Sequence, residues 1–256
     1  MGHTGTLDPF ATGLLVVLVG RATRLARFVE PRPKTYLATA RLGARTDTDD
    51  HTGAVVAESP VDGLSREAVF AALAGFVGEQ RQRPPAYSAK HIGGERSHRL
   101  ARRGAAVDPP EATVTVHRIE PLGWAPPALT FRATVSAGTY LRAIARDLGT
   151  RLGVGAHLTA LRREAIGDLR VEDAVALDRV TREALLPAAR VLGHLPAVEL
   201  DPEAKAAVVH GRAVADSVAL GQRGGEAVAL LEGAELVAVA LAEAGWLKPT
   251  VVLSPA

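Results

Sequence analysis

A carboxylate close to the start of the chain is the first candidate for chemistry. Asp8 precedes Pro9 in a short segment that also contains Gly2 and Gly5. Glycines allow tight backbone turns, and a following proline holds Asp8 in an extended conformation, so the carboxylate points in a fixed direction. Such a carboxylate can act as a nucleophile. Asp before Pro is also common in turns, where it only caps the backbone, and the residues alone leave both interpretations open.

Two further side chains are candidates for a catalytic role only if they lie near Asp8. Tyr36 follows Lys34 in a segment that alternates apolar and polar residues, and by itself it would be an ordinary strand tyrosine with a solvated hydroxyl. Arg142 stands near the start of a predicted helix, and by itself it would form a surface ion pair that contributes little. Beside a buried carboxylate, its guanidinium would instead keep that group ionised.

An acidic segment partly matches a calcium-binding loop. Asp47, Asp49 and Glu58 occupy the first, third and twelfth positions of such a loop. His51 stands at the fifth position, however, and Gly53 falls at the seventh position instead of the sixth. We therefore expect a solvated acidic loop and no metal site.

The composition excludes several classes of protein. The 256 residues contain no cysteine, which rules out disulfide scaffolds, thiolate zinc sites and cysteine nucleophiles. No apolar run approaches the roughly 20 residues that span a bilayer, and no basic, apolar leader opens the chain. We expect a cytoplasmic protein without membrane contact.

Positive charge is concentrated in one segment. The formal net charge is only +2, and from residue 195 onward four Lys or Arg oppose eight Asp or Glu. Seven cationic side chains between residues 81 and 104 accompany Glu95 alone: Arg81, Arg83, Lys90, Arg96, Arg99, Arg102 and Arg103. This strip favours a polyanionic partner, although a solvated arginine-rich helix face has the same composition.

The elements that must position these residues follow in irregular order. Apolar runs and period-two alternation predict strands over 14–19, 36–42, 112–119 and 129–135, and helical spacing predicts helices over 65–76, 95–103 and 140–152. The continuous apolar run 14–19 should form a strand that is buried on both faces. This order is typical of an α+β domain around a mostly antiparallel sheet.

The pattern changes past Pro196. Short strands are predicted over 227–231, 236–241 and 250–253, with Gly-containing turns between them. We therefore predict one domain over residues 1–194 and a small β-rich domain over residues 195–256.

Four segments together resemble TruB-type pseudouridine synthases, and the resemblance extends over almost the whole chain. The most specific is the string from Gly2 to Leu15, which contains Gly-His-Thr-Gly-Thr-Leu-Asp-Pro. The others are Lys34–Tyr36 with Arg41–Asp49, Gln82–Lys90 with Gly94–Arg102, and Ser136–Arg142 with Gly155–Arg163. His91 and His98 depart from the pattern, since the family usually has lysine and tyrosine there.

The resemblance implies a pseudouridine synthase fold, α+β with a mostly antiparallel mixed sheet, followed by a small β-rich PUA-like domain. Segment 208–214 resembles the opening of a PUA domain more weakly. Because the excess acidic charge of this tail disfavours a large phosphate footprint, we expect it to contribute modestly to RNA binding. The family normally carries a further segment before the first string, so this chain is expected to lack that N-terminal segment.

The resemblance also implies residue roles. Asp8 is the catalytic carboxylate, Arg142 pairs with it, and Tyr36 packs on the target uracil and handles the proton at C5. Tyr140 borders the uracil and Leu161 closes the pocket. The expected RNA-binding residues are His3, which fills the gap left by the flipped base, and the basic residues Lys34, Arg99, Arg102 and Arg103.

The implied reaction converts uridine to pseudouridine at position 55, in the T-loop of tRNA. The N1–C1′ bond breaks, the uracil turns and C5 joins the ribose, so no metal, redox agent or other cofactor is needed. The target base must leave its stack to reach a buried carboxylate. We expect tRNA as the partner, no obligate protein partner, and a monomer.

Two alternatives stay open. A guide-RNA-dependent synthase of the H/ACA type shares the active-site string but would be inert on tRNA without its partner proteins. A non-catalytic tRNA binder or folding chaperone would bind tRNA without forming product, and replacing Asp8 would change nothing.

Overall fold

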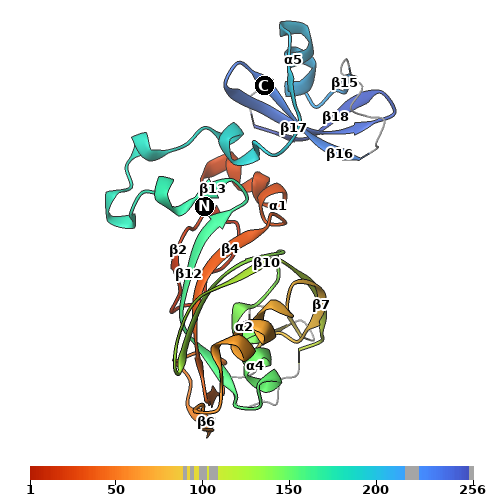
Figure 1. Ribbon diagram of the computed structural model, residues 1–256. Helices are drawn as coiled ribbons and strands as arrows, with labels where there is room; N and C mark the ends of the chain where they lie inside the picture. Colours follow the sequence, from red (N-terminus) through yellow and green to blue (C-terminus); the bar gives the residue numbers. More distant parts are fainter. Residues whose placement is uncertain (89–90, 93–94, 98–102, 104–108, 217–224, 254–256) are drawn as a thin grey trace. The chain divides into compact units, whose positions relative to one another are not determined.

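The structure is a computed structural model (Figure 1) that describes residues 1–256 apart from 89–90, 93–94, 98–102, 104–108, 217–224 and 254–256. The chain divides into two compact units. One, here called the sheet unit, contains residues 7–14 and 31–172; the other, here called the terminal unit, contains residues 1–6, 15–30 and 173–256. The terminal unit thus takes in residues on both sides of the predicted boundary at position 194.

The sheet unit is built on a mixed, mostly antiparallel sheet. Among its described residues, seven strands form this sheet in the order β13, β12, β4, β11, β10 and β7, with β2 beside β12. β2 runs parallel to β12, and the other neighbours are antiparallel. The bounds are β2 (Thr12–Gly13), β4 (Lys34–Leu42), β7 (Gly78–Gln82), β10 (Ala112–Ala125), β11 (Ala128–Val135), β12 (Ala156–Ile166) and β13 (Leu169–Arg170).

Two helices of the sheet unit pack against the sheet, α2 (Arg66–Ala74) and α4 (Leu141–Arg151). Ser65 begins α2 as predicted, since its hydroxyl oxygen accepts a hydrogen bond from the Ala68 N–H at 3.1 Å. Side chains alternate along β4, so that every second residue from Lys34 to Leu42 is buried. Tyr36 and the apolar residues after it on this face share one core with the two helices.

Shorter elements complete this unit. The acidic segment lies between β5 (Ala44–Thr46) and β6 (Val55–Glu58), which form a hairpin, and β8 (His91–Ile92) pairs with β9 (Glu95–Arg96). The predicted helix 95–103 is therefore wrong at its start, because Glu95 and Arg96 belong to a strand; most of its remainder lies outside the described residues.

The terminal unit combines a small sheet with short helices. In its described part, five strands follow the order β14, β16, β17, β18 and β15, and α5 packs on their core. The predicted strands 227–231, 236–241 and 250–253 overlap with β16, β17 and β18. The bounds are β14 (Ala197–Glu199), α5 (Pro202–Val209), β15 (Val214–Ala215), β16 (Glu226–Glu232), β17 (Glu235–Glu243), β18 (Trp246–Val252), η1 (Gly20–Leu25), α1 (Ala26–Val29), η3 (Leu177–Arg179), η4 (Arg182–Ala184) and η5 (Ala188–Leu192). The short helix η2 (Val171–Asp173) begins in the sheet unit and ends in the terminal unit.

One sequence expectation fails in the terminal unit. The run 14–19 contains only a two-residue strand, β3 (Val17–Leu18), which pairs with β1 (Gly2–His3). Leu15, Val17 and Val19 are 42%, 47% and 48% exposed. A two-stranded ribbon buries one face at most, so the prediction of a strand buried on both faces is wrong.

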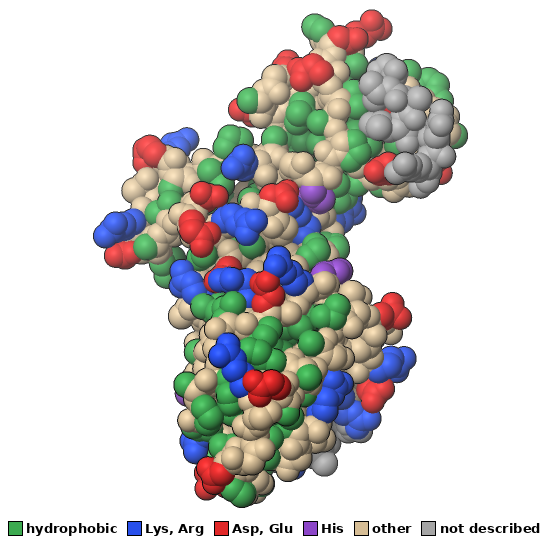
Figure 2. Space-filling model, viewed as in Figure 1, with side chains coloured by type: hydrophobic (Ala, Val, Ile, Leu, Met, Phe, Trp, Pro, Cys, Tyr) green, Lys and Arg blue, Asp and Glu red, His purple; other side chains and the backbone are tan. Residues whose placement is uncertain are grey.

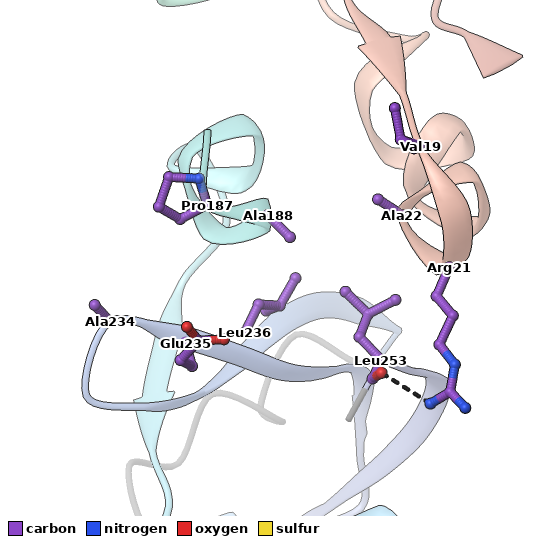
Figure 3. Close-up of a pocket in the computed structure, with 9 residues that line it drawn as sticks. All are labelled: Val19, Arg21, Ala22, Pro187, Ala188, Ala234, Glu235, Leu236 and Leu253. Carbon is purple, nitrogen blue, oxygen red and sulfur yellow. Dashed lines mark hydrogen bonds between the residues drawn. The ribbon is translucent and has the colours of Figure 1, made fainter. Parts of the chain in front are cut away.

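The terminal unit contains a pocket of about 330 Å³ lined by residues of η1, the start of η5 and β17 (Figure 3). Arg21 at its rim donates a hydrogen bond to the carbonyl oxygen of Leu253 at 3.1 Å. Charged side chains of both signs are scattered over the face drawn in Figure 2, in keeping with a net charge of only +2. None of the helices in the described ranges has the length and apolar character needed to cross a membrane.

The contact between β2 and β12 predicts a strong dependence on one glycine. Gly13 has φ of +102°, and a Cβ there would lie 2.2 Å from the carbonyl oxygen of Arg163. Gly153 also has positive φ, +74°, but a Cβ there would meet nothing within 4 Å. Gly153→Ala should lower the free energy of unfolding by about 1 kcal/mol, and Gly13→Ala by clearly more. Urea unfolding would measure both, and equal losses would contradict the close approach.

Candidate active site

The loop that carries Asp8 is fastened to the edge of β12. The Ala11 N–H donates to the carbonyl oxygen of Asp8 at 2.9 Å, which closes a turn. Directly after this turn, β2 pairs with β12, and the Leu14 N–H donates to the carbonyl oxygen of Arg163 at 2.8 Å. The Asp8 carboxylate is 24% exposed. The loop is therefore held by the sheet while its carboxylate stays accessible.

Arg142, in the first turn of α4, holds the Asp8 carboxylate with both ends of its planar fork. Nε donates to Oδ2 at 3.0 Å, and Nη2 donates to Oδ1 at 2.7 Å. Such bidentate pairs fix the orientation of a carboxylate as well as its distance. The predicted pair between these two residues is present in the structure.

The remaining N–H groups of Arg142 are also occupied. Nη1 donates to the carbonyl oxygen of Thr48 at 3.0 Å and to Oδ2 of Asp50 at 3.2 Å, and Nη2 donates to the carbonyl oxygen of Tyr87 at 2.9 Å. A guanidinium has five N–H donors, and all five have an acceptor here. The side chain is 4% exposed. Any rotation of the guanidinium would break several of these bonds, so it is fixed in place.

Asp50 is a second carboxylate at this arginine, and the sequence analysis missed it. Its Oδ1 accepts hydrogen bonds from the Thr48 hydroxyl at 2.9 Å, from the Thr52 N–H at 3.0 Å and from the Thr52 hydroxyl. Asp50 is 4% exposed. The expectation of a solvated acidic loop is therefore wrong here, because the loop folds onto the start of α4.

The neighbouring residue Asp49 pairs with the next arginine of α4. Arg146 Nη1 lies 3.1 Å from Asp49 Oδ2. Burial raises the pKa of the Asp49 carboxyl, although the charge of Arg146 opposes the shift. Two arginines four residues apart on a helix face two consecutive aspartates, and this spacing is the sequence signal that could have placed the loop.

A metal ion has no evident place in this arrangement. Within the part of the chain that the structure describes, no group of three His, Cys, Asp or Glu side chains is placed to hold one. Both oxygens of Asp50 already accept hydrogen bonds from Arg142, Thr48 and Thr52.

Tyr36 on β4 lies opposite Arg163 on β12. Arg163 is completely buried, and its Nε donates to the carbonyl oxygen of Leu14 at 2.7 Å. Burial raises the pKa of the Tyr36 phenol; Arg163 opposes this through its charge and a hydrogen bond, and the charge of Asp8 adds to it. Tyr36 is thus a protonated phenol at neutral pH. Arg163 is the other residue to which the sequence analysis assigned no role, although it ends the string Gly155–Arg163 and lies two residues after Leu161, on the same side of β12.

Of the two expected neighbours of the uracil, Leu161 is buried and Tyr140 is half-buried. Burial raises the pKa of the Tyr140 phenol, a hydrogen bond with Ser88 opposes the shift, and the charge of Asp8 adds to it. Leu161 is 7% exposed and lies opposite Ala38 on β4, in the same core as Tyr36. The structure therefore brings Tyr36 and Leu161 into one buried core, leaves Tyr140 half-buried, and places Asp8 where its charge acts on both phenols.

The residues expected to bind RNA are less clustered. Lys34 lies two residues before Tyr36 on the same face of β4, is 7% exposed, and donates to the carbonyl oxygen of Arg32 at 3.0 Å. His3 is exposed on β1 in the terminal unit, and Arg103 is exposed. Arg99 and Arg102 lie outside the described residues.

Comparisons with known proteins identify the family. A model described as TruB family pseudouridylate synthase, N-terminal domain, matches residues 1–141, which is more than half of the chain. The chain belongs to the TruB family. A second model, the C-terminal domain of tRNA pseudouridylate synthase B, matches residues 142–193.

Named relatives in the TruB family agree with this. The tRNA pseudouridine synthase B of Cupriavidus pinatubonensis is 43% identical over 224 residues, covering 84% of this chain and 71% of the relative. The tRNA pseudouridine synthase B of Azoarcus sp. is 39% identical over 255 residues, covering 97% of this chain and 83% of the relative. This TruB chain is accordingly an isomerase, a tRNA pseudouridine synthase.

Solved structures confirm the predicted fold. A chain in the structure of an H/ACA RNP bound to a substrate RNA containing 2′-deoxyuridine has a TM-score of 0.74 and 26% identity, covering 99% of this chain and 76% of that one. A chain in a Cbf5-Nop10-Gar1 complex has the same TM-score and coverage at 28% identity. The TruB chain thus has the α+β pseudouridine synthase fold, with a C-terminal β half-barrel domain.

Because all five N–H donors of its guanidinium are in use, Arg142 should not be replaceable by another cation. Arg142→Lys should lower the single-turnover rate of pseudouridine formation in tRNA by about 100-fold, because a lysine has three donors and no planar fork, and misplaced catalytic groups cost about this factor. Arg146→Lys, one turn later and paired with the same acidic loop, should change the rate only a few-fold. Circular dichroism would check that both variants fold. Equal losses would show that Arg142 acts only through the stability of the loop.

Proposed function

We propose that this enzyme forms pseudouridine at position 55, in the T-loop of tRNA, with Asp8 as its essential carboxylate. The observation that carries the proposal is the bidentate pair between Asp8 and Arg142, in which the carboxylate is fixed but still 24% exposed. A carboxylate that only capped a turn would not need a buried arginine whose other three N–H groups are also engaged.

The reaction makes limited chemical demands on the protein. The N1–C1′ bond breaks and a C5–C1′ bond forms; the proton on C5 leaves, and N1 gains one. Asp8 acts as nucleophile toward the ribose or the ring, and its remaining lone pairs are available because each oxygen accepts one bond from Arg142. No electron is gained or lost, so Asp8 needs no redox partner.

Tyr36 handles the C5 proton in this proposal and packs on the uracil. Its phenol is protonated at neutral pH, as an ordinary tyrosine is, and holds the proton more firmly because burial raises its pKa. It therefore cannot serve as a ready-made phenolate, and it must pass on its own proton as it receives another. Arg163, which is buried and hydrogen-bonded to the phenol, stabilises the negative charge that develops during that exchange.

Recognition of tRNA follows from shape and charge. The target base is flipped out of its stack, Tyr140 borders it, Leu161 closes the pocket, and His3 fills the gap. The basic side chains of Arg99, Arg102 and Arg103 contact phosphates, whereas Lys34, which is buried and donates to the carbonyl oxygen of Arg32, supports the strand that carries Tyr36. A folded hairpin with splayed loop bases suits this kind of recognition.

A tRNA enzyme that acts alone is favoured over a guide-dependent one. The relatives named tRNA pseudouridine synthase B are 39% to 44% identical to this chain, whereas the matching chains in the H/ACA RNP structure and in the Cbf5-Nop10-Gar1 complex are 26% and 28% identical. We accordingly propose a monomer in the cytoplasm with tRNA as substrate and no obligate protein partner.

An unmodified tRNA transcript tests the proposal. The wild-type chain without added cofactor should form pseudouridine at position 55, and Asp8→Asn should remove at least about 99.9% of the rate while tRNA affinity stays within about twofold. Asp49→Asn is the matched control: its carboxylate is similarly placed but pairs with Arg146, so the rate should fall only a few-fold.

Three results would contradict the proposal. Product at another position would show that position 55 is not the target. A rate that survives Asp8→Asn would show that the Asp8 carboxylate is not essential. A wild-type chain that binds tRNA but forms product only with a guide RNA and partner proteins would support the H/ACA type.

A further inference from the structure

The side chain of Gln82 makes an unusual pair of contacts with the backbone of one residue. Gln82 ends β7 and is 2% exposed. Its Oε1 accepts a hydrogen bond from the Tyr140 N–H at 2.8 Å, and its Nε2 donates to the Tyr140 carbonyl oxygen at 3.2 Å. The side-chain amide thus pairs with the N–H and the carbonyl oxygen of one extended residue, as the backbone of a neighbouring strand would.

Tyr140 needs such a partner because of its place in the chain. It precedes the first turn of α4, has extended backbone angles (φ −104°, ψ 115°), and its side chain makes no capping hydrogen bond to the helix. Its carbonyl oxygen also accepts the first bond of α4, from the Ile144 N–H at 3.2 Å. Gln82 therefore fixes the backbone at the point where the loop becomes the helix.

Two arginines of α4 fasten the segment that follows Gln82. Arg142 Nη2 donates to the carbonyl oxygen of Tyr87 at 2.9 Å, and Arg146 Nη2 donates to that of Arg83 at 2.8 Å. The segment 82–87 and the start of α4 are thus joined at three successive places. Of these three, only the bonds of Gln82 act directly on the backbone of Tyr140.

We infer that Gln82 is a positioning residue of the isomerisation, which holds the Tyr140 backbone so that the Tyr140 ring and the Arg142 fork keep their places beside Asp8. The inference rests on the role proposed above for Tyr140 at the uracil. Because Gln82 is buried, it does not contact the body of the tRNA. Its loss should therefore lower the rate at saturation and leave tRNA affinity unchanged.

Gln82→Met tests this inference, because methionine is about as long as glutamine but cannot make the two hydrogen bonds of the amide to Tyr140. The single-turnover rate at position 55 should fall about 10-fold to 100-fold, with the dissociation constant for tRNA within about twofold. Gln80→Met is the matched control. Gln80 lies on the same face of β7 and donates to the Phe76 carbonyl oxygen at 2.8 Å instead of to Tyr140. It should lose comparable thermal stability and keep its rate.

Gln82→Glu separates positioning from folding. An ionised carboxylate still accepts from the Tyr140 N–H but cannot donate to the carbonyl oxygen, whereas a protonated one can do both. The rate of this variant relative to wild type should therefore rise as pH falls from about 8 to about 6, since burial raises the pKa of a carboxyl group.

Outcomes for the two proposals are distinguishable. A wild-type chain that is inactive at position 55 contradicts the proposed function. An active wild type together with a Gln82→Met variant of normal rate, or a Gln82→Glu ratio that does not change with pH, overturns the positioning role.

Discussion

The guanidinium of Arg142 joins three stretches of chain that are remote in sequence. It binds the carboxylate of Asp8, the acidic loop at Thr48 and Asp50, and the backbone at Tyr87. Each of these acceptors would cost about 1 to 3 kcal/mol or more if it were buried and left unpaired. The geometry of the site is thus a property of one side chain and of the helix that carries it. The sheet, in turn, matters because it holds α4 and the Asp8 loop at the right separation.

A second buried arginine, Arg163, also holds groups of the site in place. Arg163 on β12 binds the backbone of Leu14 and the phenol of Tyr36, so that it fixes the end of the Asp8 loop and the expected partner of the uracil. Buried charges are costly to desolvate and are weak evidence of stability. Their value here is positional, since both arginines hold functional groups at fixed distances.

Much of this arrangement could be predicted from the sequence. The alternation along β4 and the helix after Tyr140 follow from local patterns, and the pair of Asp8 with Arg142 was expected from the resemblance to the family. The burial of Asp50 could not be predicted, because an aspartate in a polar loop resembles a solvated one until the arginine that meets it, about 90 residues away in sequence, is known. The prediction of a buried strand over residues 14–19 was wrong for a similar reason, because an apolar run does not show whether other elements will cover both of its faces. The RNA-binding roles of His3, Arg99 and Arg102 remain predictions.

The most direct test is a crystal structure of the Asp8→Asn variant bound to a T-stem and loop RNA with uridine at the target position. The account predicts that this uridine has left its stack, with its ribose or ring in contact with the side chain at position 8 and its base between Tyr36 and Tyr140. Arg142 should keep its bonds to Asp50, Thr48 and Tyr87. A uridine still stacked in the loop, or bound away from position 8, would contradict the account.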